Sequence, residues 1–207
     1  TGSLLKRSPS LTLRVTVVFV ALLLIAHSSR AEDAPKPHEC RFTEATITID
    51  GKAEEKAWAA AEVIDQFQLP WLGKEARAAK TATKARLLWD RDNLYFFAEM
   101  VDADLYADVK EHDGNTWDND VFELFFKPSN DKLGYYEFQV NALGTVFDMF
   151  IPRRGQVNRF KKTDEFHIEQ KVSLDGTLND WTDRDKGWSV EGRIPWRDFI
   201  KTGGRPA

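Results

Sequence analysis

The stretch that decides the fold is VFELFFKPSNDKLGYYEFQVNALGTVFDMFI, residues 121–151. It contains three runs of strand length, VFELFF, YYEFQVN and TVFDMFI, which are rich in aromatic and β-branched residues. Segments with Pro, Asn, Asp and Gly separate them. Such runs, divided by turn residues, predict antiparallel strands joined as hairpins. No long amphipathic helical pattern interrupts this part of the sequence.

Further runs of strand length lie on both sides of this stretch. They are ATITID (45–50), KARLLWD (84–90), LYFFAEMVD (94–102), EFHIEQKVS (165–173) and GWSVEGRI (187–194). The segment AEEKAWAAA (53–61) has helix-forming residues for about two turns. The sequence therefore predicts an all-β fold, an antiparallel β-sandwich of jelly-roll-like type with one short helix near the start.

The first residues differ in character from the rest of the chain. Lys6, Arg7 and Arg14 precede the apolar run VTVVFVALLLIA, which small and polar residues follow. This order is typical of a signal peptide, and the run is shorter than the roughly 20 residues that cross a bilayer. We predict a signal peptide over residues 1–31, a secreted or periplasmic location, and no membrane association of the mature form.

The remainder divides into a polar leader over residues 32–40 and a sandwich domain over residues 41–207. A last strand that finishes near Ile194 suggests that an edge strand lies beyond Ala207, so we expect the domain to be truncated at the C-terminus. The single cysteine, Cys40, excludes an internal disulfide. A formal charge of -4 and a pI near 5.6 provide no basic field for phosphate backbones, which argues against nucleic acid as a partner.

Side chains alternate between the two faces of a strand, so the central runs can be sorted by face. Phe122, Leu124 and Phe126 are expected to point into the core. The opposite face would carry Glu123 opposite Gln139 if residues 127–134 close a hairpin. Its other expected members are Trp117, if the strand begins that early, and Val121, Phe125, Tyr135, Glu137 and Asn141. In the third run we expect Phe147 and Met149 in the core and Asp148 on the opposite face.

This second face combines an aromatic plate with carboxylate and amide groups. A pyranose ring has an apolar face that stacks on an aromatic side chain, and a rim of hydroxyls that forms hydrogen bonds. Trp117 and Glu123 together therefore suggest a sugar site. The alternative is an ordinary solvated face, which antiparallel sheets often have.

The same alternation places Asp118 and Asp120 on the core side, where burial of an unpaired carboxylate would be too costly. We expect them at the entrance of the strand, where they bind backbone amides or a cation. Oxygen ligands of this kind suit Ca²⁺. Further aspartates in residues 90–92 and 102–108 add oxygens, but none matches an EF-hand loop, and a turn-forming cluster of aspartates is the alternative.

With these residues in hand, the chain resembles the family 9 carbohydrate-binding modules and related domains of exported bacterial proteins. The resemblance rests on five blocks in order, spread over residues 46–196: IDGKAEEKAW, ARLLWDRDNLYFFAEMVD, TWDNDVFELFFKP, GYYEFQVNALGTVFD and GWSVEGRIPW. It implies a jelly-roll sandwich, structural calcium, and recognition of sugar chain ends between two tryptophans.

The resemblance also assigns roles to residues. Trp117 matches one of the two tryptophans, and Glu123 matches the carboxylate that binds sugar hydroxyls. Gln139 stands where the family can carry an arginine. Trp71 in the segment LPWLG is a candidate for a second platform, the alternative being a loop tryptophan that folds back over the core. The tryptophans inside patterned elements are expected in the core: Trp58, Trp89, Trp188 and Trp196.

Two other functions compete with sugar binding. The first is a glycosidase with its carboxylate pair drawn from Asp118, Asp120 and Glu123, but residues at one strand entrance rarely flank a cleft. A haem-binding electron-transfer sandwich is the second alternative, with Met100, Met149 and His167 as possible ligands. We predict a secreted, non-catalytic module with a carbohydrate ligand, held at Trp117, Glu123, Glu137, Gln139, Asn141 and Trp71.

Overall fold

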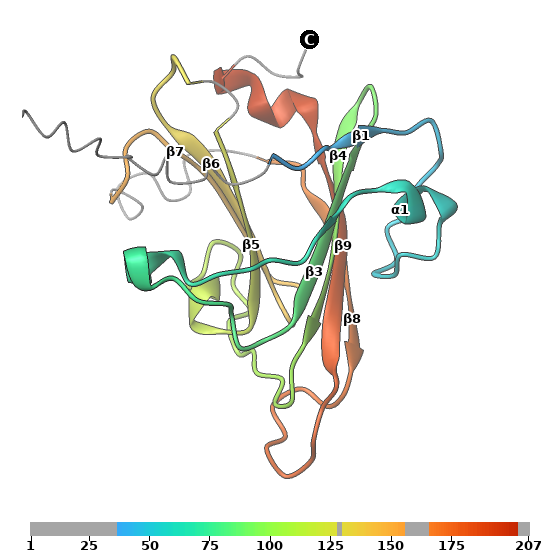
Figure 1. Ribbon diagram of the computed structural model, residues 1–207, viewed down its shortest axis with the longest axis vertical. Helices are drawn as coiled ribbons and strands as arrows, with labels where there is room; N and C mark the ends of the chain where they lie inside the picture. Colours follow the sequence, from blue (N-terminus) through green and yellow to red (C-terminus); the bar gives the residue numbers. More distant parts are fainter. Residues whose placement is uncertain (1–36, 128–129, 156–165, 203–207) are drawn as a thin grey trace, which may run out of the picture. The chain divides into compact units, whose positions relative to one another are not determined.

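The computed structural model describes residues 37–127, 130–155 and 166–202. In this part of the chain two β-sheets face each other around a shared core, as Figure 1 shows. This confirms the prediction of an all-β sandwich. The predicted signal peptide and the first residues of the leader lie outside the described residues. No helix among the described residues is long and apolar enough to cross a bilayer.

The larger sheet has six strands in the order β1-β3-β4-β9-β8, with β2 also paired to β3. β1 runs parallel to β3, and the other pairs are antiparallel. Its inward side chains include Phe96 and Val190, both fully buried. The strands are β1 (Arg41–Phe42), β2 (Val63–Ile64), β3 (Thr83–Trp89), β4 (Asn93–Val101), β8 (Glu169–Asp175) and β9 (Gly187–Pro195).

The smaller sheet has the order β5-β6-β7 and is antiparallel throughout. The loop between β5 and β6 closes a hairpin with Glu123 opposite Gln139, as predicted. Phe122, Leu124 and Phe138 point into the core shared with the larger sheet. The strands are β5 (Val121–Phe126), β6 (Tyr135–Asn141) and β7 (Val146–Ile151).

A short helix, α1 (Lys56–Ala60), covers part of the other side of the larger sheet. Trp58 of this helix is buried against Phe97 of β4. Its indole Nε1 donates a hydrogen bond to Oε1 of the buried Glu191 on β9 at 2.9 Å. Burial raises the pKa of Glu191, although the hydrogen bonds that it accepts lower it. The Glu191 carboxylate therefore links α1 to the larger sheet through a hydrogen bond.

The prediction of a strand at residues 45–50 is wrong. This segment lies beside α1 as part of the same cover, with Ile47 buried, and residues 45–50 are not assigned to a strand. The backbone amides of Asp50 and Gly51 donate to Oε2 of Glu191 at 2.9 and 3.0 Å. The Glu191 carboxylate thus accepts hydrogen bonds from two backbone amides that would donate to a neighbouring strand if this segment belonged to the sheet.

The four tryptophans that were predicted in the core are found there or at its edge. Trp58 and Trp188 are buried. Trp89 and Trp196 are half-buried and meet edge to face, with ring centroids 6.4 Å apart. Trp196 begins the last described element, η3 (Trp196–Thr202).

The predicted faces of β7 are wrong. Phe138 of β6 points into the shared core and pairs directly with Asp148 of β7, so Asp148 lies on the inward face. Phe147 and Met149 lie on the opposite face, where they form a separate buried cluster with Ile151. The cause is the turn after Asn141, which sets the register through pairing of Val140 with Val146.

Candidate functional site

The candidate site lies on the outer face, by which we mean the face of the smaller sheet that points away from the larger sheet. The register arranges its side chains in rows across the strands. One row contains Glu123, Gln139 and Phe147, and the next contains Phe125, Glu137 and Met149. Neighbouring strands in a sheet lie about 4.8 Å apart, so each row is about 10 Å long.

Trp117 reaches this face from a short helix and not from β5. The strand begins at Val121, and Trp117 belongs to η2 (Thr116–Asp118). Its ring and that of Phe147 on β7 meet in a T-shaped arrangement, with centroids 5.5 Å apart and an interplanar angle of 81°. The residue as a whole is 40% exposed. Trp117 therefore stands over the β7 end of the first row, with aromatic surface open to solvent.

A chain of buried hydrogen bonds holds η2 to the sheet. The hydroxyl of Thr116 donates to Oε1 of Gln139 at 2.5 Å. The amide nitrogen of Gln139 donates to Oε1 of Glu137 at 2.6 Å. Thr116 and Gln139 have almost no exposed surface. The position of Trp117 is thus linked through its neighbour to the carboxylate of Glu137.

Two carboxylates lie close together beside this chain of bonds. Glu123 and Glu137 are neighbours on adjacent strands of the outer face. Burial raises the pKa of Glu123, and the charge of Glu137 raises it further. Burial also raises the pKa of Glu137, while the hydrogen bond from Gln139 lowers it. Glu123 keeps more exposed surface than Glu137 and is therefore the more accessible acceptor.

The two amides predicted to contact sugar are buried below this surface. Asn141 has no exposed surface. Its amide nitrogen donates to the Val109 carbonyl at 2.9 Å and to Oδ1 of Asn119 at 3.0 Å. Its Oδ1 accepts the backbone amides of two residues in the following turn. Gln139 and Asn141 thus position the segments that flank the outer face.

Asp118 and Asp120 lie at the entrance of β5, as predicted. Asp118 is exposed at the end of η2. Oδ2 of Asp120 accepts the backbone amide of Tyr106 at 2.7 Å, so one of the two expected roles, binding a backbone amide, is observed. Burial raises the pKa of Asp120, and the charges of Asp102 and Asp104 raise it further. These oxygens fit a hard cation such as Ca²⁺ in chemical type, and calcium at this entrance stays a prediction.

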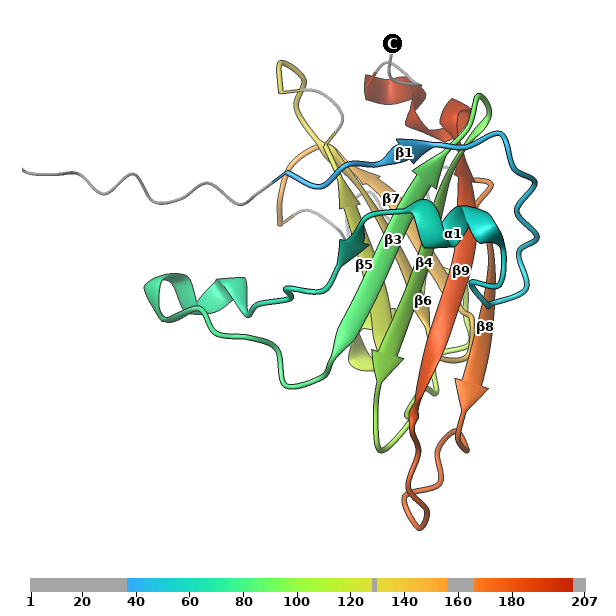
Figure 2. The same ribbon diagram turned by 45° about the vertical axis from the view of Figure 1, so that its right-hand side comes forward.

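Trp71 is not part of the smaller sheet and lies in the segment between β2 and β3. It belongs to η1 (Pro70–Glu75) and is 76% exposed. Figure 2 shows the segment of η1 on an arm that projects away from both sheets. The backbone bonds at the base of this arm join residues 67–69 with residues 77–79. The alternative in which this tryptophan folds back over the core is therefore wrong.

The structure also shows exposed or clustered residues to which the sequence assigned no role. Phe125, expected on this face but not assigned a role, is 56% exposed and lies 6.2 Å from the ring of Tyr135. Trp181, in the loop between β8 and β9, is 83% exposed. A histidine and two aspartates, His112, Asp113 and Asp148, converge beside β7. The alternation pattern gave no signal for this group, because it placed Asp148 on the wrong face.

The residues proposed as haem ligands do not come together. Met100 is buried in the core between the sheets, and Met149 is buried in the cluster on the outer face. Nδ1 of His167 lies 2.9 Å from Oδ1 of Asp198. The two methionines are core residues, which is the common role of methionine on a strand.

Comparison with known proteins agrees with this architecture. The model of the family "Carbohydrate family 9 binding domain-like" matches residues 49–207. The chain is 35% identical over 103 residues to an endo-1,4-beta-xylanase A of Thermotoga neapolitana and 36% identical over 105 residues to that of Thermotoga maritima. Each alignment covers 47% of this chain and only 9% of the xylanase, so the chain spans less than a tenth of these curated relatives.

One solved structure resembles the chain in fold, and a second is reported beside it. A protein from Bacteroides uniformis has a TM-score of 0.54 and 16% identity, over 78% of this chain and 73% of that protein. A family 9 module from Caldicellulosiruptor kristjanssonii in complex with glucose has a TM-score of 0.49 and 19% identity, over 81% of this chain and 70% of that module. The family match extends over most of the chain and confirms the resemblance: the chain belongs to the family of carbohydrate family 9 binding domain-like proteins.

Proposed function

We propose that this chain is a carbohydrate-binding module and that it binds a sugar ring on the outer face, between Trp117 and the carboxylates of Glu123 and Glu137. The observation that supports this most directly is the partly exposed Trp117, held at the end of the row that contains Glu123, with Glu137 in the next row. Membership of a carbohydrate-binding family supports the same ligand class.

Each group has a separate role in this proposal. The exposed part of Trp117 stacks on the apolar face of the ring. Glu123 accepts hydroxyl hydrogen bonds, which are stronger than usual because the acceptor carries a charge. Gln139 and Asn141 act below the surface as positioning residues. Phe125 with Tyr135 provides a second aromatic surface beyond the carboxylates, in place of Trp71.

We further propose that the module binds without catalysis. A glycosidase places two carboxyl groups across a cleft from each other, on the two sides of the scissile bond. Glu123 and Glu137 instead lie on adjacent strands of one face. The relatives that share this segment are xylanases many times its length. A binding role within a larger exported protein that degrades polysaccharides is therefore our proposal for its context, with a signal peptide over residues 1–31.

Calorimetry with mono- and oligosaccharides of glucose and xylose tests the proposal. Trp117→Ala should raise Kd at least about tenfold, as expected for loss of a central aromatic contact. Glu123→Gln should also weaken binding, because the acceptor loses its charge. The matched control is Trp181→Ala, which removes another exposed indole and should leave Kd unchanged.

Two outcomes would count against this site. Equal affinity of the parent and Trp117→Ala would place the sugar elsewhere. A loss of affinity in Trp71→Ala would restore this exposed tryptophan as a platform for the sugar. If no sugar in the panel binds the parent, the proposed function fails.

A further inference from the structure

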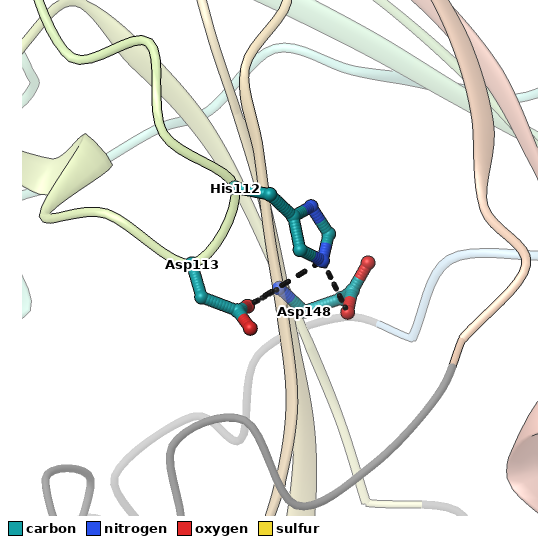
Figure 3. A group of neighbouring side chains, drawn as sticks. All are labelled: His112, Asp113 and Asp148. Atoms are coloured by element: carbon teal, nitrogen blue, oxygen red, sulfur yellow. Dashed lines mark hydrogen bonds and ion pairs between the residues drawn. The ribbon is translucent and has the colours of Figure 1, made fainter.

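Three side chains from two segments converge beside β7, as Figure 3 shows. His112 and Asp113 lie in the loop before η2, and Asp148 lies on β7. Nε2 of His112 is 3.5 Å from Oδ1 of Asp148 and 3.7 Å from Oδ1 of Asp113. One ligand atom from each residue lies within 4.8 Å of the others.

The two carboxylates are buried, whereas the imidazole is open to solvent. The side chains of Asp113 and Asp148 are 8% and 4% exposed, and that of His112 is 61% exposed. The backbone holds them in place, because the amide of Asp113 donates to the Val146 carbonyl at 3.0 Å. A buried carboxylate is costly unless it is paired or binds a metal. One imidazole supplies at most a single positive charge against two carboxylates.

The distances in this group are long for direct hydrogen bonds. A nitrogen–oxygen hydrogen bond has a typical length of about 2.9 Å. The other histidine–aspartate pair of the described chain has that length, since Nδ1 of His167 lies 2.9 Å from Oδ1 of Asp198. Ligand atoms around a tetrahedral Zn²⁺ are instead about 3.3 Å apart, given ligand distances of about 2.0 to 2.1 Å. The 3.5 and 3.7 Å separations around His112 are closer to the second value.

We propose that His112 Nε2, Asp113 Oδ1 and Asp148 Oδ1 form a binding site for a divalent transition metal of the Zn²⁺ type. Imidazole nitrogen suits Zn²⁺ and other first-row transition metals, whereas Ca²⁺ and Mg²⁺ favour oxygen ligands alone. Three protein ligands leave one tetrahedral position for water. The site differs in residues and in donor type from the calcium predicted at Asp118 and Asp120.

A bound cation would neutralise the two buried carboxylates, which are costly to bury without a partner of opposite charge. It would also fasten the loop that carries His112 and Asp113 to the edge of β7.

Titration of the chelator-treated chain with Zn²⁺, followed by calorimetry, tests this site. We expect one Zn²⁺ per chain at this position. In metal sites generally, loss of a residue that only hydrogen-bonds to a ligand reduces metal affinity about 10- to 100-fold. Loss of a direct ligand in His112→Gln or Asp148→Asn should therefore reduce it at least about tenfold. The matched control is His167→Gln, which changes another histidine that faces a buried aspartate and should leave the affinity unchanged. A large excess of Ca²⁺ should not compete.

The readout is metal binding, so the test does not depend on any glycan. Thermal unfolding in the presence of a chelator shows whether each variant is folded, and the exposed imidazole makes His112→Gln the safer variant. Zn²⁺ affinity that is the same in the parent and in folded His112→Gln would overturn the proposal. So would the lack of a stoichiometric Zn²⁺ site in the parent, or equal weakening by His167→Gln.

Discussion

The buried bonds below Trp117 allow a quantitative test through Gln139→Leu. Leucine fills a similar volume but forms neither the bond to Thr116 nor the bond to Glu137. Gln139 is 1% exposed and Thr116 is fully buried, so both partners lose a hydrogen bond that water cannot easily replace. Each unsatisfied buried group costs about 1 to 3 kcal/mol, and we expect a loss of about 2 to 5 kcal/mol in the free energy of unfolding.

A double-mutant cycle separates this effect from simple loss of packing. Thr116→Val removes the hydroxyl and keeps the shape of the side chain. In Thr116→Val/Gln139→Leu no hydroxyl is left without a partner, so the double variant should lose about 1 to 2 kcal/mol less than the sum of the single variants. Urea unfolding, followed by tryptophan fluorescence, measures all four free energies. Additivity within about 0.5 kcal/mol would refute the coupling of η2 to β6 through these two side chains.

Two further predictions concern ionisable groups. Since the folded pKa of Glu123 is raised above its ordinary value of 4.5, its contribution to stability is fully present below pH 4.5 and is lost as pH rises through the folded pKa. Glu123→Gln should therefore increase the free energy of unfolding relative to the parent at pH 7 and not at pH 4, and a difference that does not vary with pH would contradict this. Burial raises the pKa of the Cys40 thiol from 9.0 to about 11. At pH 8 its thiolate population falls about 100-fold, and mass spectrometry should find iodoacetamide reacting about 100-fold more slowly with the folded than with the urea-unfolded chain, whereas equal rates would count against the burial.

Much of the fold was predictable from the sequence, because most strands are covered on at least one side. The predicted runs coincide closely with β3 to β7 and with β9, and the run YYEFQVN is β6 itself, whereas β8 begins at Glu169, inside the run predicted at residues 165–173. Alternation in β5 identified Phe122 and Leu124 as core residues. It also placed Glu123 opposite Gln139, because a hairpin with one buried face has a defined register.

Residues 45–50 show why alternation is not sufficient to define a strand. The pattern was correct in one respect, since Ile47 is buried and Ile49 packs against the same cluster. What it could not indicate was the hydrogen-bond partner. Glu191 lies about 140 positions away along the chain, and its carboxylate accepts the amides of Asp50 and Gly51. A contact so distant in sequence leaves no local signal.

The sequence predicted which face of the sheet carries the candidate site, but not which of its side chains are buried. The alternation of side chains along β6 predicted the face of Gln139 and Asn141. Both residues are buried because a loop and the helix η2 cover them. Trp117 reached the expected face although it is not in the strand, because η2 carries it over Phe147. Tertiary contacts of this kind override a prediction based on periodicity alone.

The wrong prediction of the face on which Asp148 lies is the most informative error. The prediction assumed that Phe147 and Met149 point into the shared core, which would place the carboxylate outside. A three-residue turn at residues 142–144 pairs Asn141 with Thr145, and the pairing then continues to Phe138 with Asp148. A shift of one residue exchanges the two faces of a strand, so the turn forces a carboxylate inward and two large apolar residues outward. The chain accommodates the apolar pair by covering it and the carboxylate by surrounding it with His112 and Asp113. Polar residues that conflict with the local pattern are expected at functional sites, and Asp148 is such a residue in the part of β7 where we propose the metal.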